Sequence, residues 1–132
     1  GKAMNIENLN AQIFLKTIVD CSEVIRFFNI YSGIIFDSAS ADCIRSDAVG
    51  LVQPAVHNFG FKSSFLFTWP RSELDGVDEW KLGITLANYF STDVLVENTD
   101  IRTDTEKWIL TRKDGTQRLV DIIVVEDGID VG

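Results

Sequence analysis

The residues of this chain best suited to catalysis are one histidine and two cysteines. His57 lies just before an aromatic segment, and a catalytic histidine needs a nucleophile or a carboxylate held beside it. No local motif supplies either group, although the sequence leaves open an approach in space by Cys21, Cys43 or one of several serines. A packed structural histidine is the better interpretation, and the sequence predicts no catalytic residue.

The same side chains make a poor metal site. Cys21 and Cys43 are distant in the sequence and fit no zinc signature with a single histidine. Oxygen ligands are plentiful from Asp93 to Glu106, but they lack the ordered spacing and central glycine of a calcium loop. We therefore expect no metal and no cofactor. The cysteines favour two reduced thiols over a disulfide, as in a cytoplasmic protein.

Phosphate-binding and acid–base motifs are also missing. None of Gly83, Gly115 and Gly128 belongs to a glycine-rich phosphate loop. Asp78 and Glu79 are adjacent carboxylates, but acids that stand before a helix are more often caps and partners of the helix dipole. The sequence therefore predicts a protein that is not an enzyme.

The most informative feature of the composition is its excess of acidic residues. The chain has 12 Lys and Arg against 20 Asp and Glu, a net charge of −8. Residues 1–66 hold five basic and six acidic residues, whereas residues 67–132 hold seven and 14, so the second half carries −7. An acidic surface repels phosphate, which disfavours nucleic-acid binding. Solubility alone is the simpler interpretation of the same charge.

The elements that position these residues begin with a helical pattern from Ile6 to Tyr31. It predicts two helices or one bent helix, with Asp20 or Ser22 as a cap and Gly33 as the end. A short strand at residues 17–19 stays open. The apolar residues that approximate one helical stripe are Ile6, Leu9, Ile13, Ile18, Cys21, Ile25 and Phe28. Residues 37–48 show no period and predict a loop with at most one helical turn.

Alternation in residues 61–69 predicts a strand with a buried aromatic face, which Pro70 ends. Ser63 is the exception on that face. The aromatic residues that share it are Phe61, Phe65, Phe67 and Trp69. A helix capped by Asp75 or Asp78 follows. The apolar residues on its predicted inner side are Val77, Trp80, Ile84, Ala87 and Tyr89 or Phe90.

The rest of the chain predicts strands at residues 93–97, 107–112 and 117–125. Asp114-Gly115 predicts a hairpin with a type I′ turn, and Asp127-Gly128 predicts a final turn before residues 129–131.

These elements together indicate an α+β fold, an antiparallel sheet of four or five strands with helices packed on one face. The chain length suits a single domain over residues 4–132, and Gly1 to Ala3 are interpreted as a vector remnant before Met4. No apolar run is long enough to span a bilayer, and we expect no signal peptide and no membrane contact.

Residues 80–128 resemble the C-terminal half of small acidic bacterial proteins, among them immunity proteins that neutralise toxins. The shared segments are Leu86-Ala87, Asp93-Val94-Leu95, Trp108-Ile109-Leu110, Asp114-Gly115 and the tail from Val120 to Gly128. Immunity proteins share no catalytic residues. The resemblance therefore implies only that acidic side chains cover the basic active site of a toxin, often a nuclease.

Two functions follow as expectations. The first is a non-enzymatic binding or inhibitor protein, of bacterial and mobile-element character, that engages a basic protein partner. The residues expected to bind this partner are Asp93, Glu97, Asp100, Asp121, Glu126 and Asp127. The alternative is a small-ligand-binding domain with an aromatic pocket. The residues expected to line that pocket are His57, Phe59, Trp69 and Trp80.

Overall fold

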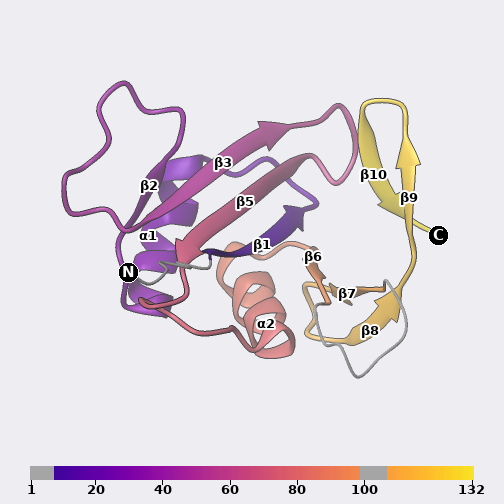
Figure 1. The fold of residues 1–132 in the computed structure, drawn as a ribbon. Coiled ribbons are helices and arrows are strands. Elements are labelled where there is room, and N and C mark those ends of the chain that lie inside the picture. The colour runs from indigo at the N-terminus through magenta and orange to yellow at the C-terminus, as the bar shows by residue number, and fades with distance from the viewer. Residues whose placement is uncertain (1–7, 99–106) are drawn as a thin grey trace. The chain divides into compact units, whose positions relative to one another are not determined.

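The structure is a computed structural model that describes residues 8–98 and 107–132. The described residues form two helices, ten strands and two sheets, one of seven strands and one of three (Figure 1). The helices are α1 Cys21–Ser32 and α2 Glu79–Phe90. The strands are β1 Asn8–Leu15, β2 Phe36–Ser38, β3 Gly50–Val56, β4 Phe59–Gly60, β5 Ser63–Pro70, β6 Val94–Glu97, β7 Trp108–Thr111, β8 Gln117–Val120, β9 Ile122–Val125 and β10 Gly128–Val131.

The α+β class is confirmed, but the predicted antiparallel sheet of four or five strands is wrong. The large sheet has the strand order β2-β3-β5-β1-β6-β7-β8 and is mixed, because β2 and β3 run parallel. The small sheet has the order β4-β10-β9. Prediction fell short because short strands such as β2 and β4 carry too few residues to show an alternating pattern.

The chain divides into two compact units, and three of the five boundaries between them fall within β1, β3 and β5. Unit 1 contains the described residues 8–11, 19–54 and 65–76. Unit 2 contains residues 12–18, 55–64, 77–98 and 107–132. That the chain folds as one domain stays a prediction, for which the Discussion gives a test.

The first helix predicted from the N-terminal pattern is instead β1. Its residues Ile13, Phe14 and Leu15 are consecutive, and all three are buried. Consecutive residues of a strand point to opposite faces, so both faces of β1 are buried at this end and its sequence shows neither clean alternation nor a polar face. Of the predicted stripe, Ile13 lies in this buried part of β1 and Leu9 is half-buried in the same strand, whereas Ile6 lies outside the described residues.

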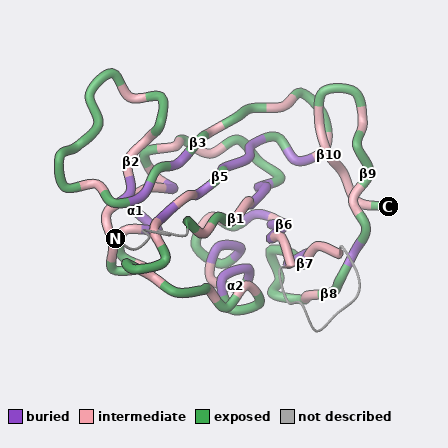
Figure 2. The backbone as a smooth tube through the Cα atoms, in the orientation of Figure 1, coloured by how far each residue is buried: buried purple, intermediate pink, exposed green. Residues whose placement is uncertain are grey.

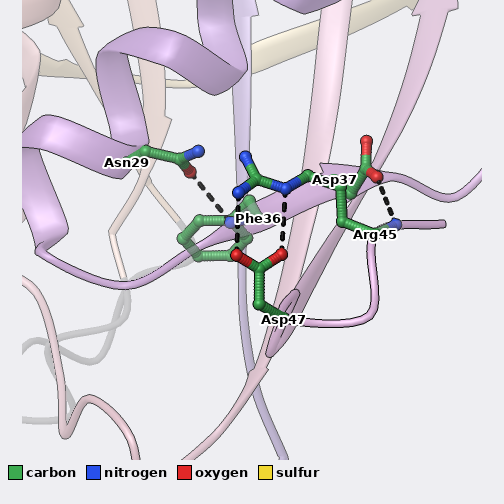
Figure 3. A network of polar contacts seen from close by, with 5 residues as sticks. All are labelled: Asn29, Phe36, Asp37, Arg45 and Asp47. Atoms are coloured by element: carbon green, nitrogen blue, oxygen red, sulfur yellow. Dashed lines mark hydrogen bonds and ion pairs between the residues drawn. The ribbon is translucent and has the colours of Figure 1, made fainter.

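The second predicted helix is confirmed as α1. Asp20 stands at its N-cap but makes no side-chain capping bond. Gly33 ends the helix at φ 79°, and its N–H donates to the Asn29 carbonyl. The Asn29 side chain accepts the Phe36 N–H at 2.8 Å, which joins α1 to the start of β2 (Figure 3).

Three of the four aromatic residues predicted to share one strand face lie in β5 and in the core of unit 1, whereas Phe61 precedes β5 and belongs to the core of unit 2. Phe65, Phe67 and Trp69 are all at most 4 % exposed, and Figure 2 shows the buried stretches of β5 in purple. The ring centroid of Phe67 lies 4.0 Å from that of Phe28 and 5.5 Å from that of Phe36. The aromatic residues of this strand therefore serve as core in unit 1.

A polar network orders the loop that follows β2. The Asp37 carboxylate accepts the N–H groups of Ser38 and Arg45, each at 2.8 Å, and these bonds hold the pKa of Asp37 below its usual value. Arg45 in turn binds Asp47 through two nitrogens, at 2.9 and 2.7 Å (Figure 3). The predicted loop is thus confirmed from residue 39 onward, and its first two residues belong to β2.

Unit 2 contains antiparallel pairs of β6 with β7 and of β7 with β8, and the strands predicted at residues 93–97 and 107–112 are confirmed as β6 and β7. Strand residues 117–125 do not form one strand, because Asp121 separates β8 from β9 and the two belong to different sheets. The buried residues of this core are Phe14, Phe61, Leu95, Leu110 and Val120.

The inner face of α2 differs from the prediction. Asp78 caps the helix as expected, with its carboxylate accepting the Lys81 N–H at 3.2 Å. The residues that α2 buries are Leu82, Gly83, Leu86 and Ala87, whereas Trp80, Ile84 and Tyr89 are exposed. A side chain at Gly83 would place its Cβ 2.4 Å from Thr111 Oγ1. Because only glycine leaves room for this close approach to Thr111, the side of α2 that carries Gly83 is the side that packs against β7.

The predicted hairpin between β7 and β8 is present, but its type I′ turn is wrong. Gly115 has φ 93°, while Asp114 is not among the described residues with positive φ. The Gly115 N–H donates to the Arg112 carbonyl at 2.8 Å, and the Arg112 N–H donates to the Thr116 carbonyl at 2.9 Å. This is a three-residue loop with its left-handed residue last.

Gly115→Val should lower the free energy of unfolding by about 1–2 kcal/mol, because a β-branched residue is strained at positive φ. No atom lies within 4 Å of the added Cβ, so the loss would come from the backbone alone. Gly115→Asn is the matched control and should lose less, since asparagine tolerates left-handed backbone. Thermal unfolding measures both, and equal stability of all three proteins would contradict this conformation.

Candidate functional site

The three-stranded sheet of unit 2 depends on two glycines. β4 pairs parallel with β10, with Phe59 opposite Gly128 and Gly60 opposite Ile129. An added Cβ would lie 2.1 Å from the Ile129 carbonyl oxygen at Gly60 and 2.2 Å from the Phe59 carbonyl oxygen at Gly128. Only glycine at both positions lets the two backbones approach this closely.

The register of this sheet separates its residues into two faces. Ile122, Ile129 and Val131 share one face and pack against the core of unit 2. Phe59 and Ile123 lie on the opposite face, where they are 59 % and 47 % exposed. These two exposed apolar side chains, with Asp130 opposite Ile123 on the same face, form a small patch suited to contact with another protein.

Acidic side chains border this patch at the turn between β9 and β10. Glu126 and Asp127 are exposed, and Asp127 has φ 57°. The Asn58 side chain donates to the Asp127 carboxylate and so fixes it beside β4. Val124 is 80 % exposed on the opposite face of β9 from Phe59 and Ile123. We call this set, Phe59, Ile123, Val124, Glu126 and Asp127, the β9 surface.

Two more carboxylates near the β9 surface take part in ion pairs. Asp121, which precedes β9, lies 3.0 Å from the Lys107 ammonium, and Asp130 in β10 lies 3.6 Å from that of Lys16. Both pairs are largely exposed to solvent, where such pairs contribute about 0–1 kcal/mol to stability. These acids therefore remain available to a partner at little cost to the fold.

The six acids predicted to bind a partner do not lie together. Asp93 and Glu97 flank opposite ends of β6, and Asp93 accepts the Lys113 N–H at 2.9 Å. Burial, and then the charge of Glu79, raise the pKa of Glu97. Asp100 lies outside the described residues. Of the six, Glu126 and Asp127 belong to the β9 surface, and Asp121 lies at the start of the same strand.

The four residues predicted to line a pocket have different surroundings. Trp69 is buried in unit 1, where its indole N–H donates to the Leu74 carbonyl at 2.7 Å. In unit 2, Phe59 and Trp80 are exposed, and His57 is half-buried. Trp69 is therefore a core residue, and Phe59 belongs to an open surface.

His57 has the contacts of a structural histidine. Its Nε2 lies 2.9 Å from the hydroxyl of Ser64, and its ring packs 6.1 Å from that of Phe14. Ser64 is only 5 % exposed, so its hydroxyl is inaccessible as a nucleophile. These contacts join His57 to β5 through Ser64 and to β1 through Phe14, all within unit 2.

A hollow of about 270 Å³ lies between the exposed side of α2 and the β7–β8 turn. Its lining residues are Ile84, Thr85, Asn88, Lys113, Asp114 and Gly115. None of the residues predicted for the aromatic pocket lines it. Within the described ranges, no three His, Cys, Asp or Glu side chains are grouped to hold a metal ion. No described helix is long and apolar enough to cross a membrane.

The two units carry the same net charge, although the two halves of the sequence do not. Over their full ranges, unit 1 holds four basic and eight acidic residues and unit 2 holds eight and twelve, so each carries −4. Net charge thus does not distinguish the units. The distinguishing feature is local, because residues 121–132 contain four acids and no base.

Comparisons of the chain with protein-family models, with curated proteins and with solved structures find no match.

Sequence analysis named the acids of the β9 surface and named Phe59 only as a pocket residue, and it missed Ile123 and Val124. The run Ile122-Ile123-Val124-Val125 is typical of a strand buried on both faces. The Asp127-Gly128 turn that follows this run was the available signal that it pairs in a hairpin. Exposure of Phe59 has no counterpart in the sequence pattern.

Proposed function

We propose that this protein is a non-enzymatic binding protein, of inhibitor type, that engages a basic protein partner through the β9 surface. One observation carries the proposal: Phe59 and Ile123 are exposed on one face of the small sheet and Val124 on the other face of its edge strand, and the exposed carboxylates Glu126 and Asp127 follow that strand. An apolar centre with a charged border is the usual anatomy of a protein interface.

The two parts of this surface would contribute differently to binding. Burial of the apolar side chains supplies affinity, and phenylalanine is among the residue types enriched at protein interfaces. The carboxylates supply attraction at long range, which speeds encounter with a positively charged partner and rejects acidic ones. A small-ligand function has less support, because Trp69 is core and Phe59 lies in the open.

A neutralised variant tests the proposal. It carries three substitutions on and beside β9, Asp121→Asn, Glu126→Gln and Asp127→Asn. Asparagine suits the positive φ of position 127, so the turn should be preserved. We expect the variant to melt like wild type and to associate with the basic partner about tenfold more slowly at low salt. At high salt, where exposed charges are screened, the two rates should converge.

The matched control removes the same charge from unit 1, through Asp42→Asn, Glu73→Gln and Asp75→Asn. The partner is captured from the source cell, and association is then followed by stopped-flow fluorescence at low and high ionic strength. The control should associate like wild type. If the two variants slow association equally, only net charge matters and the β9 surface is not the binding site.

A further inference from the structure

β9 is an edge strand. It stands last in the order β4-β10-β9, and its inner side pairs antiparallel with β10, from Val125 opposite Gly128 to Ile122 opposite Val131. Among the described residues of unit 2, no strand pairs with its outer side. An unpaired edge presents a row of backbone donors and acceptors that a further strand can use.

The hydrogen-bond pattern shows which backbone groups face outward. The Gly132 N–H donates to the Asp121 carbonyl at 3.1 Å, so these two opposed residues form a hydrogen-bonded pair. Opposed residues of an antiparallel ladder alternate between bonded and non-bonded pairs. Ile123 therefore directs its N–H and C=O towards β10. Ile122 and Val124 direct theirs to the outer edge.

The side chains of β9 also suit an added strand. All four are β-branched, the type that packs best on a pleated surface. Ile123 is 47 % exposed and Val124 is 80 % exposed, on opposite faces of the strand. A neighbouring strand would therefore find an apolar cross-strand contact on each face.

Charges at both ends of β9 indicate what kind of strand it accepts. Asp121 precedes the strand, and Glu126 and Asp127 follow it. A strand laid along β9 would meet carboxylates at its two ends and apolar side chains between them. Basic residues at the ends and β-branched residues in the middle complement that arrangement.

A second copy of this chain is the wrong occupant. Two antiparallel β9 strands would bring Asp121 of one copy beside Glu126 and Asp127 of the other, at both ends of the ladder. Like charges this close oppose pairing, and each copy also carries a net charge of −8. The edge is thus protected against self-association and open to a basic chain.

We infer that β9 binds an extended basic segment of the partner as an additional antiparallel strand, an inference that rests on the proposed function. The N–H and C=O groups of Ile122 and Val124 hydrogen-bond to the added backbone. Asp121 and Glu126 face Lys or Arg side chains at its two ends. Strand addition gives affinity through the backbone and specificity through the side chains.

β8 offers a matched control, because it is the last strand of the seven-stranded sheet. Arg112 N–H donates to the Thr116 carbonyl, and the same alternation directs the N–H of Leu119 outward. The neighbours of this edge include Arg112 and Arg118, which repel a basic strand. A proline at Leu119 therefore removes an outward N–H from an edge that the inference does not use.

The probe is a capped peptide with the sequence Lys-Val-Thr-Val-Thr-Lys, in which the lysines face Glu126 and Asp121. Isotope-labelled protein is titrated with it and followed by nuclear magnetic resonance. The amides of Ile122 and Val124 should shift and exchange more slowly with solvent, while the Ile123 amide is already bonded to β10 and should change little. A peptide with glutamate in place of both lysines should not bind.

Val124→Pro removes the outward N–H and should weaken peptide binding about tenfold, while Leu119→Pro should not. Edge strands tolerate proline where the N–H faces solvent, so the β9–β10 ladder should persist. A second pair of probes works even if Val124→Pro unfolds the hairpin. In the antiparallel register, N-methylation of the two threonines blocks the bonds to β9, and N-methylation of the two valines does not.

Equal binding of all the peptides, or of Val124→Pro and wild type, overturns the inference. Concentration-dependent dimers that disappear in Val124→Pro would also overturn it in favour of a second copy. The full partner separates the two proposals. If it binds Val124→Pro as tightly as wild type but associates slowly with the neutralised variant, the proposed function stands and strand addition fails. If neither variant changes its binding, the proposed function itself fails.

Discussion

Phe67→Ala is expected to lower the free energy of unfolding by about 3–5 kcal/mol, the usual loss for a buried phenylalanine. Phe67 is 1 % exposed, and its ring packs against those of Phe28 and Phe36, with centroid distances of 4.0 and 5.5 Å. Alanine would leave a cavity among rings that are themselves held by α1 and β2. Thermal and denaturant unfolding measure the loss, and Phe59→Ala, at an exposed position, should cost little.

The same substitution tests whether the chain folds as one domain. Leu95→Ala creates the corresponding cavity in unit 2, where Leu95 is fully buried against Phe14 and Leu110. In a single cooperative domain, either substitution should shift one common transition and increase amide exchange in both units. Two separate transitions, each sensitive to only one of the substitutions, would show that the units unfold independently.

Gly128→Ala is expected to cost about 2–3 kcal/mol, because the added Cβ has no space. It would stand 2.2 Å from the Phe59 carbonyl oxygen, so β4 must move away from β10. The backbone of Gly128 itself is not in the left-handed region, and the loss therefore reports packing alone.

Amide hydrogen exchange at Asn58 and Phe61 reports directly on this pairing, since their N–H groups donate to the carbonyls of Asp127 and Ile129. Both should exchange faster in the Gly128→Ala variant. Gly132→Ala is the control in the same hairpin, where the nearest atom to the new Cβ is the flexible Ile123 Cδ1 at 3.2 Å. Equal stability of the two variants would contradict the close pairing of β4 and β10.

Local signals predicted the elements whose surroundings match their own pattern. β5 alternates because one of its faces is aromatic and buried, and Gly33 ends α1 because glycine adopts positive φ at no cost. β1 was missed because its burial depends on neighbouring strands. β3 was missed because it contains Pro54, which argues against a strand when no partner strand is known.

For the site too, properties of single residues could be predicted and properties that depend on tertiary structure could not. Asp121, Glu126 and Asp127 could be proposed from charge, which is a property of the residues themselves. Exposure of Phe59 and Val124 depends on where the small sheet ends, and only tertiary structure determines that. Asp93 and Glu97 were grouped with the others by sequence proximity, yet they flank opposite ends of β6.

The ordered loop of unit 1 that follows β2 provides a site for labelling the protein in these experiments. Cys43 is exposed within it, whereas Cys21 is half-buried and burial raises the pKa of its thiol. A maleimide dye near neutral pH should therefore attach to Cys43 first, because the thiolate is the reactive form. The label would stand on the unit that contributes no residue to the β9 surface, so partner association can be followed by fluorescence without altering the surface under study.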